Sequence, residues 1–176
     1  FYSINNTQHG LTGMGLGKVL IGQVVEQIKT AHTQIKNFST LSPLPGFWHR
    51  YLKKILQGQD QAFNLKRAEV VSFFPRKNQE LLMSKFADLE HKDICDLLLV
   101  SLEDPQWPRN QEFAELIRKP LVDIAYHYVT VEQDEKGNPL NPVASFHLSN
   151  GASVTRQCIN FLANASSRGL EESCGI

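Results

Sequence analysis

Apolar residues recur at every third or fourth position in four stretches of the chain, and this spacing predicts four amphipathic helices. The four ranges are 16–30, 47–56, 86–102 and 113–128. Gly58 closes the second helix and Asp104-Pro105 ends the third, because glycine and proline interrupt helical backbone. Pro120 lies inside the fourth and predicts either a kink or a fresh helix start.

Three short runs of strand-forming residues lie outside these helices, at 1–4, 37–41 and 142–148. In the last run, side chains alternate between two faces, and Asn150-Gly151 behind it is typical of a two-residue hairpin turn. The order strand, glycine-rich loop, helix, strand over the first 41 residues predicts a βαβ unit with parallel strands. Together these patterns predict a mixed sheet flanked by helices.

Size and composition narrow the function classes. The 176 residues suffice for one domain with a core, and both ends of the sequence look like those of a fragment of a longer protein. The 18 basic and 18 acidic residues balance, without a basic stripe, which disfavours a nucleic-acid partner. No apolar run reaches the roughly 18 residues that a membrane-spanning helix needs. The three cysteines lack the spacing of metal ligands, so we expect reduced thiols.

The glycine-rich stretch from Thr12 to Lys18 precedes the first predicted helix. Its residues are Thr12, Gly13, Met14, Gly15, Leu16, Gly17 and Lys18. Glycines at such a place let backbone N–H groups approach an anion at the positive end of the helix. The stretch matches neither a P-loop nor GxGxxG, but it fits the looser pattern of a pyrophosphate cradle in acyl-coenzyme A-binding acetyltransferase folds. The alternative is a turn that only packs a strand against a helix.

Ser42 and His147 are the candidate acid/base pair. A hydroxyl and an imidazole that titrates near neutrality are the minimum equipment for proton transfer at an active site. His147 shares a strand face with Ser145, opposite Phe146 and Leu148, as expected of a side chain directed into a cleft. The alternatives are a serine that ends a strand and a half-buried structural histidine. No two histidines have metal-ligand spacing, which disfavours a metal site.

At these residues the sequence resembles the malonyl-CoA decarboxylase family. The resemblance rests mainly on Ser42-Pro-Leu-Pro-Gly-Phe47 and Asn141-Pro-Val-Ala-Ser-Phe-His147, with further matches in family order near both ends. It covers nearly the whole chain, and the helical middle diverges most. The resemblance implies an α/β, GNAT-like fold: a mixed central sheet flanked by helices, with a helical insertion in the middle.

The resemblance also implies the domain and the site. Residues 1–176 would form a partial catalytic domain, without the family's N-terminal helical domain and C-terminal end. The acyl-CoA-binding loop falls on Thr12 to Lys18, and the catalytic pair falls on Ser42 and His147. Gly15 stands where some family members have an acidic residue, so any role of that carboxylate is absent here.

The implied reaction converts malonyl-CoA to acetyl-CoA and carbon dioxide, in malonyl-CoA and fatty acid metabolism. No cofactor is expected, because the coenzyme A thioester is itself the electron sink. The expected partners are malonyl-CoA and acetyl-CoA, with any homo-oligomer formed through regions outside this stretch. The expected location is cytoplasmic, with mitochondria or peroxisomes as the alternatives in a eukaryote. Two other functions stay open: acyl transfer on the same fold, and a non-catalytic acyl-CoA-binding fragment.

Overall fold

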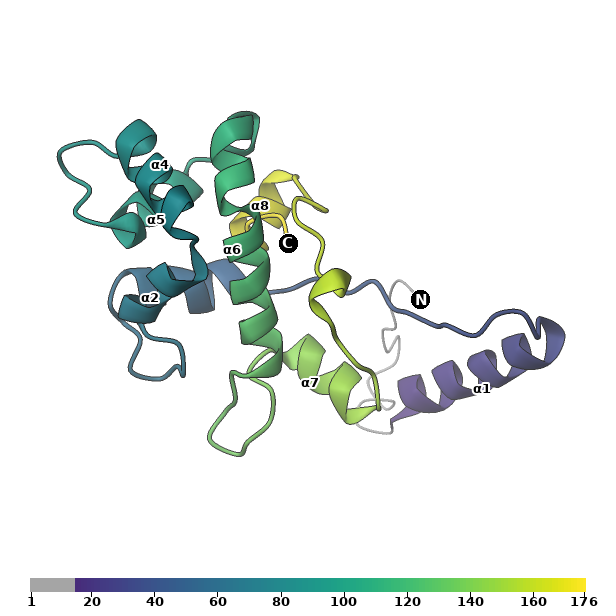
Figure 1. The fold of residues 1–176 in the computed structure, drawn as a ribbon. Coiled ribbons are helices and arrows are strands. Elements are labelled where there is room, and N and C mark those ends of the chain that lie inside the picture. Colours follow the sequence, from purple (N-terminus) through teal and green to yellow (C-terminus); the bar gives the residue numbers. More distant parts are fainter. Residues whose placement is uncertain (1–14) are drawn as a thin grey trace. The chain divides into compact units, whose positions relative to one another are not determined.

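A computed structural model describes residues 15–176 of the chain. The chain divides into two compact units, residues 1–43 and residues 44–176, which we describe separately. Both are helical in their described parts (Figure 1). Across residues 15–176 the backbone forms helices and one isolated bridge between Gln133 and Pro139, and no strand.

The predicted α/β, GNAT-like fold with a mixed central sheet is therefore wrong for the described residues. Residues 1–4, the first predicted strand, lie outside them. Residues 37–41 have no regular secondary structure, so the predicted βαβ unit is not formed there. The third predicted strand is a helix, α7 (Pro142–Ser149), and Figure 1 shows it as such.

Local capping explains why residues 142–149 form a helix. The Asn141 side chain accepts a hydrogen bond from the backbone N–H of Ala144 at 2.9 Å, and proline occupies the first helical position. Both features favour a helix start. Gly151 then ends α7 with a φ of 84° and donates to the carbonyl of Leu148 at 3.0 Å. Asn150-Gly151 is thus a helix C-terminal turn, and seven alternating residues were too few to outweigh these signals.

The first unit contains α1 (Leu16–Ala31), which confirms the first predicted helix. None of its residues is buried, and Leu16, Val19 and Leu20 are each about half exposed. A helix with this pattern is not stabilised by a core of its own.

The second unit contains the remaining helical elements. They are η2 (Phe47–Leu52), α2 (Lys53–Leu56), α3 (Arg67–Val70), η3 (Val71–Phe73), α4 (Arg76–Phe86), α5 (Ile94–Glu103), η4 (Trp107–Arg109), α6 (Gln111–Thr130), α7, η5 (Arg156–Cys158) and α8 (Ser167–Ser173). In Figure 1, α6 runs through the middle of this unit, with α2, α4 and α5 on one side of it. Its buried face supplies much of the core, including Ile117, Leu121 and Ile124.

The structure confirms two of the three helices predicted in this unit and moves the start of the other one. The second is confirmed and begins with the π-helical turn η2. The fourth is confirmed as α6, which continues as one helix through the buried Pro120. The third begins at Ile94 instead of residue 86, because the Asp93 side chain accepts from the backbone N–H of Asp96 at 3.0 Å and caps α5 there. Helices α4 and α8 were not predicted.

Gly169 in α8 allows a close approach that a larger residue would prevent. A Cβ at this position would lie 2.2 Å from the backbone oxygen of Asn164. We expect Gly169→Ala to lower the free energy of unfolding by about 2 kcal/mol, since backbone must move to admit the methyl group. Thermal or urea unfolding measures the change. Gly22→Ala is the control, because a Cβ there meets no atom within 4 Å, and equal behaviour of the two variants would contradict the expectation.

Candidate functional site

The glycine-rich stretch lies only partly within the described residues. Thr12, Gly13 and Met14 fall outside them. Gly15 has a φ of 66° and precedes α1, and its carbonyl accepts from the backbone N–H of Lys18 at 3.1 Å. The first turn of α1 contains no acidic residue. No carboxylate in this turn therefore neutralises the positive end of the helix or repels an anion bound there.

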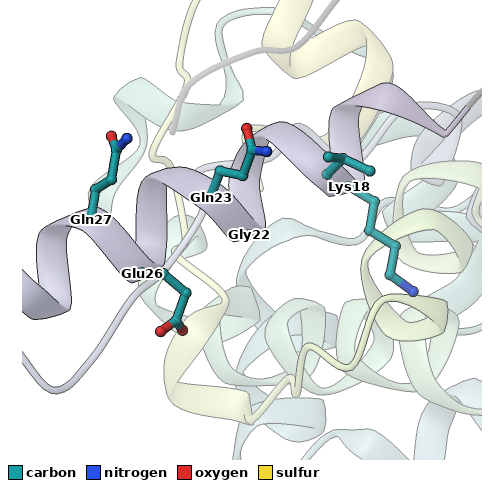
Figure 2. A pocket seen from close by; sticks show the side chains of 6 residues that line it. Lys18, Gly22, Gln23, Glu26 and Gln27 are labelled. Atoms are coloured by element: carbon teal, nitrogen blue, oxygen red, sulfur yellow. The ribbon is translucent and has the colours of Figure 1, made fainter.

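A shallow depression lies on the surface of α1 (Figure 2). Among the described residues, those that line it all belong to this helix: Lys18, Val19, Gly22, Gln23, Glu26 and Gln27. In Figure 2, Gln23 and Gln27 extend to one side of the helix and Glu26 to the other. A surface provided by one helix does not enclose a ligand as a coenzyme site must. The depression by itself therefore does not identify an acyl-CoA pocket.

Ser42 and His147 belong to different units. Ser42 is exposed in the segment without regular structure that ends the first unit. His147 lies on α7 in the second unit and is partly buried. Each unit is described by itself, so the convergence of these two side chains stays a prediction.

Within the second unit, the structure joins the two motifs on which the family resemblance rests. The Asn141 side chain is fully buried, and its Nδ2 donates to the carbonyl oxygen of Pro45 at 3.2 Å. The backbone N–H of Gly46 donates to Oε2 of Glu172, on α8, at 3.2 Å. The turn before η2 thus contacts both the start of α7 and the last turn of α8. The sequence pattern assigned no role to Glu172, and it marked Asn141 only as the first residue of a motif.

A buried carboxylate lies at the end of α6. Glu132 is 1% exposed, and its carboxylate accepts from the Tyr51 hydroxyl and from the backbone N–H groups of Asn64 and Leu65, each at 2.9 Å. Nε2 of His127 lies 3.4 Å from the same carboxylate. Burial, and then the charge of Glu132, raise the pKa of Tyr51 far above its ordinary value. Tyr51 is therefore a neutral hydrogen-bond donor here.

Tyr51 connects this carboxylate to the region of the two motifs. Its ring stacks on that of Tyr128 with centroids 4.5 Å apart, and Phe47 lies 5.8 Å from Tyr128. Burial raises the pKa of Tyr128, and a side-chain hydrogen bond with Asn141 opposes that rise. The aromatic residues of η2 and α6 therefore pack between Glu132 and Asn141. No sequence pattern pointed to Glu132, because it follows a helix in a polar stretch.

The described part of the chain lacks two further classes of feature. Residues 15–176 contain no group of three His, Cys, Asp or Glu side chains placed to hold a metal ion. They also contain no helix that is long and apolar enough to cross a membrane. All three cysteines are free thiols, and burial raises the pKa of Cys95 to about 11. Cys95 is thus a protonated core residue at neutral pH.

Comparison with known proteins gives the family. The model of the malonyl-CoA decarboxylase C-terminal domain matches residues 1–176. The mitochondrial malonyl-CoA decarboxylases of Anser anser anser and Rattus norvegicus are each 35% identical to the chain over 176 residues. The match covers 100% of this chain and 32% and 33% of those proteins, respectively.

Two crystal structures of bacterial malonyl-CoA decarboxylases are similar as well. The enzyme from Agrobacterium vitis matches with 34% identity and a TM-score of 0.71, over 99% of this chain and 36% of its own. The enzyme from Rhodopseudomonas palustris matches with 34% identity and a TM-score of 0.66, over 99% and 33%. The chain thus spans about a third of the length of these relatives. On the match over all of its residues, the chain belongs to the malonyl-CoA decarboxylase family.

Proposed function

We propose that this chain contributes to the decarboxylation of malonyl-CoA to acetyl-CoA and carbon dioxide. The observation that carries the proposal is the family match over all 176 residues, together with relatives of that name at 34–35% identity. Because the chain covers only about a third of those relatives, the activity is assigned to the complete natural protein that contains it.

The chemistry needs few groups. The bond between the carboxylate carbon and the α-carbon breaks, carbon dioxide leaves, and the electron pair moves into the thioester as an enolate. The α-carbon then takes up one proton, which yields acetyl-CoA. The thioester carbonyl is the electron sink, so the proposed step requires a carboxylate-orienting group, an oxyanion donor and a proton donor.

We assign the first and last of these roles to Ser42 and His147. The Ser42 hydroxyl would hydrogen-bond the malonyl carboxylate and hold it out of the plane of the thioester. The protonated His147 imidazole would deliver the proton to the α-carbon. In support, Ser42 precedes Pro45 by three residues, His147 follows Asn141 by six, and Asn141 donates to the Pro45 carbonyl.

The coenzyme A part of the substrate is assigned to the stretch from Thr12 to Lys18. Phosphate oxygens would accept from backbone N–H groups at the start of α1. The left-handed Gly15, the absence of an acidic residue in the first turn of α1 and the cation of Lys18 support this assignment.

The direct test incubates the complete protein with malonyl-CoA, with and without EDTA, and measures the acetyl-CoA and carbon dioxide that form. The proposed reaction yields the two products in equal amounts. A parallel reaction follows label from acetyl-CoA to an amine or alcohol acceptor. Carbon dioxide release that persists in EDTA is the expected result. Label transfer without carbon dioxide release, or acetyl-CoA binding with neither reaction, would overturn the proposal.

Ser42→Ala should lower kcat for decarboxylation by about tenfold, the effect of one lost hydrogen bond to a charged group. Binding of acetyl-CoA, which lacks the carboxylate, should change little in calorimetry. Ser39→Ala is the matched control, since Ser39 is an exposed serine of the same segment. If Ser42→Ala has the kcat of the parent protein, Ser42 has no role in the reaction.

A further inference from the structure

We propose that Asn141 is a positioning residue, which sets α7 and its His147 against the Pro45–Phe47 turn through the two ends of one buried amide. The inference rests on the proposed function for its catalytic consequence, but its structural part stands on the contacts of Asn141 alone.

The two ends of the Asn141 amide have different tasks. Oδ1 accepts from the backbone N–H of Ala144 at 2.9 Å and so caps α7. Nδ2 donates to the Pro45 carbonyl, 96 positions earlier in the chain, at 3.2 Å. An N-cap bond lies within the first turn of α7 and does not by itself fix the direction of the helix relative to its neighbours. The second hydrogen bond fixes the start of the helix to the turn that precedes η2.

Burial makes this connection specific. Asn141 has no exposed surface, so the loss of either hydrogen bond removes a partner from an amide that water does not reach, at a free-energy cost. The residue next to Pro45, Gly46, has a φ of 76° and donates to Glu172 on α8. The carbonyl that Asn141 contacts therefore belongs to a turn that is held from a second side.

The position of His147 follows from that of Asn141. His147 lies six positions after Asn141, and residues 142–149 form one continuous helix of two turns. The backbone N–H of Ser145 donates to the Asn141 carbonyl at 2.8 Å, so the first turn of α7 is closed directly on the anchor. A displacement at Asn141 is thus transmitted along a rigid element to His147, and catalysis is sensitive to misplacements of about 1 Å.

The test separates capping from positioning by replacing asparagine with serine at two different helix N-caps. Asn141→Ser keeps an N-cap oxygen for α7 but removes the donor to Pro45. Asn110→Ser is the control, because Asn110 caps α6 through the N–H of Phe113 at 3.1 Å and is exposed. The complete protein carries each variant. Hydrogen exchange of α7 amides and steady-state kinetics with malonyl-CoA are measured.

For Asn141→Ser we expect exchange of the α7 amides to rise about tenfold, and kcat to fall about tenfold with KM within about threefold. Asn110→Ser should leave both unchanged within about twofold. Unchanged α7 exchange in Asn141→Ser overturns the proposal whatever the activity, and raised exchange with the kcat of the parent overturns its catalytic part. A parent protein without carbon dioxide release refutes the proposed function, and hydrogen exchange still decides whether Asn141 holds α7.

Discussion

His147→Gln is expected to lower kcat for carbon dioxide release by about a hundredfold or more, while acetyl-CoA binding stays close to that of the parent protein. Glutamine preserves the size and hydrogen bonding of the side chain but has no proton that titrates near neutrality. General acid catalysis contributes about 10²- to 10⁴-fold, so its loss should exceed every other single-residue effect on the rate.

The control for this experiment is His49→Gln. His49 is an exposed histidine of the same unit, with its Nε2 3.7 Å from Glu171. Loss of its imidazole should leave kcat unchanged within about twofold. Decarboxylation is followed by carbon dioxide release and acetyl-CoA binding by calorimetry. If the two variants have the same kcat, His147 is not the proton donor.

Glu132→Ala is expected to cause the largest loss of stability, about 4 kcal/mol. The substitution leaves the Tyr51 hydroxyl and the N–H groups of Asn64 and Leu65 without the acceptor that each has now. An orphaned buried donor costs about 1–3 kcal/mol. Glu132→Gln should lower the free energy of unfolding by about 2 kcal/mol. The single oxygen of the glutamine amide can accept only from the donors on one side of the present carboxylate, and its NH₂ group then faces the donor on the other side.

Urea unfolding of both variants measures these losses, and Glu135→Gln is the matched control. Glu135 is exposed and three residues away, so its charge should be dispensable. A midpoint for Glu132→Ala equal to that of Glu135→Gln would show that the buried carboxylate does not hold the segment around Asn64 and Leu65 to the end of α6.

Helical periodicity predicted the two longest helices well, although only α6 buries an apolar face. α1 and α6 agree with their predicted ranges within a few residues. Prediction was wrong where capping decided the structure. The Asp93 cap starts α5 eight residues late, and the Asn141 cap with its following proline makes a helix of a predicted strand. These signals are present in the sequence, but the alternation of residues 142–148 favoured a strand there.

The residues of the candidate site could be predicted from the sequence, but the contacts between distant ones could not. Ser42, His147 and the stretch from Thr12 to Lys18 could be proposed from motifs, because their residue types suit the chemistry at those spacings. Asn141 could have been identified as a helix cap from the Asn-Pro pair alone. Its bond to Pro45 could not, since a contact across 96 positions depends on where the intervening helices return the chain.

The sequence by itself determined the family, the two longest helices and the residue types available for decarboxylation, because composition, motif order and 3.6-residue periodicity are local properties. Only the tertiary structure decided that Glu132 is a buried acceptor and that the turn at Pro45 and Gly46 meets α7 and α8. The physical reason is that burial and long-range hydrogen bonds arise from packing. A glutamate in a polar stretch and an asparagine before a proline acquire these roles when α6 brings distant segments together.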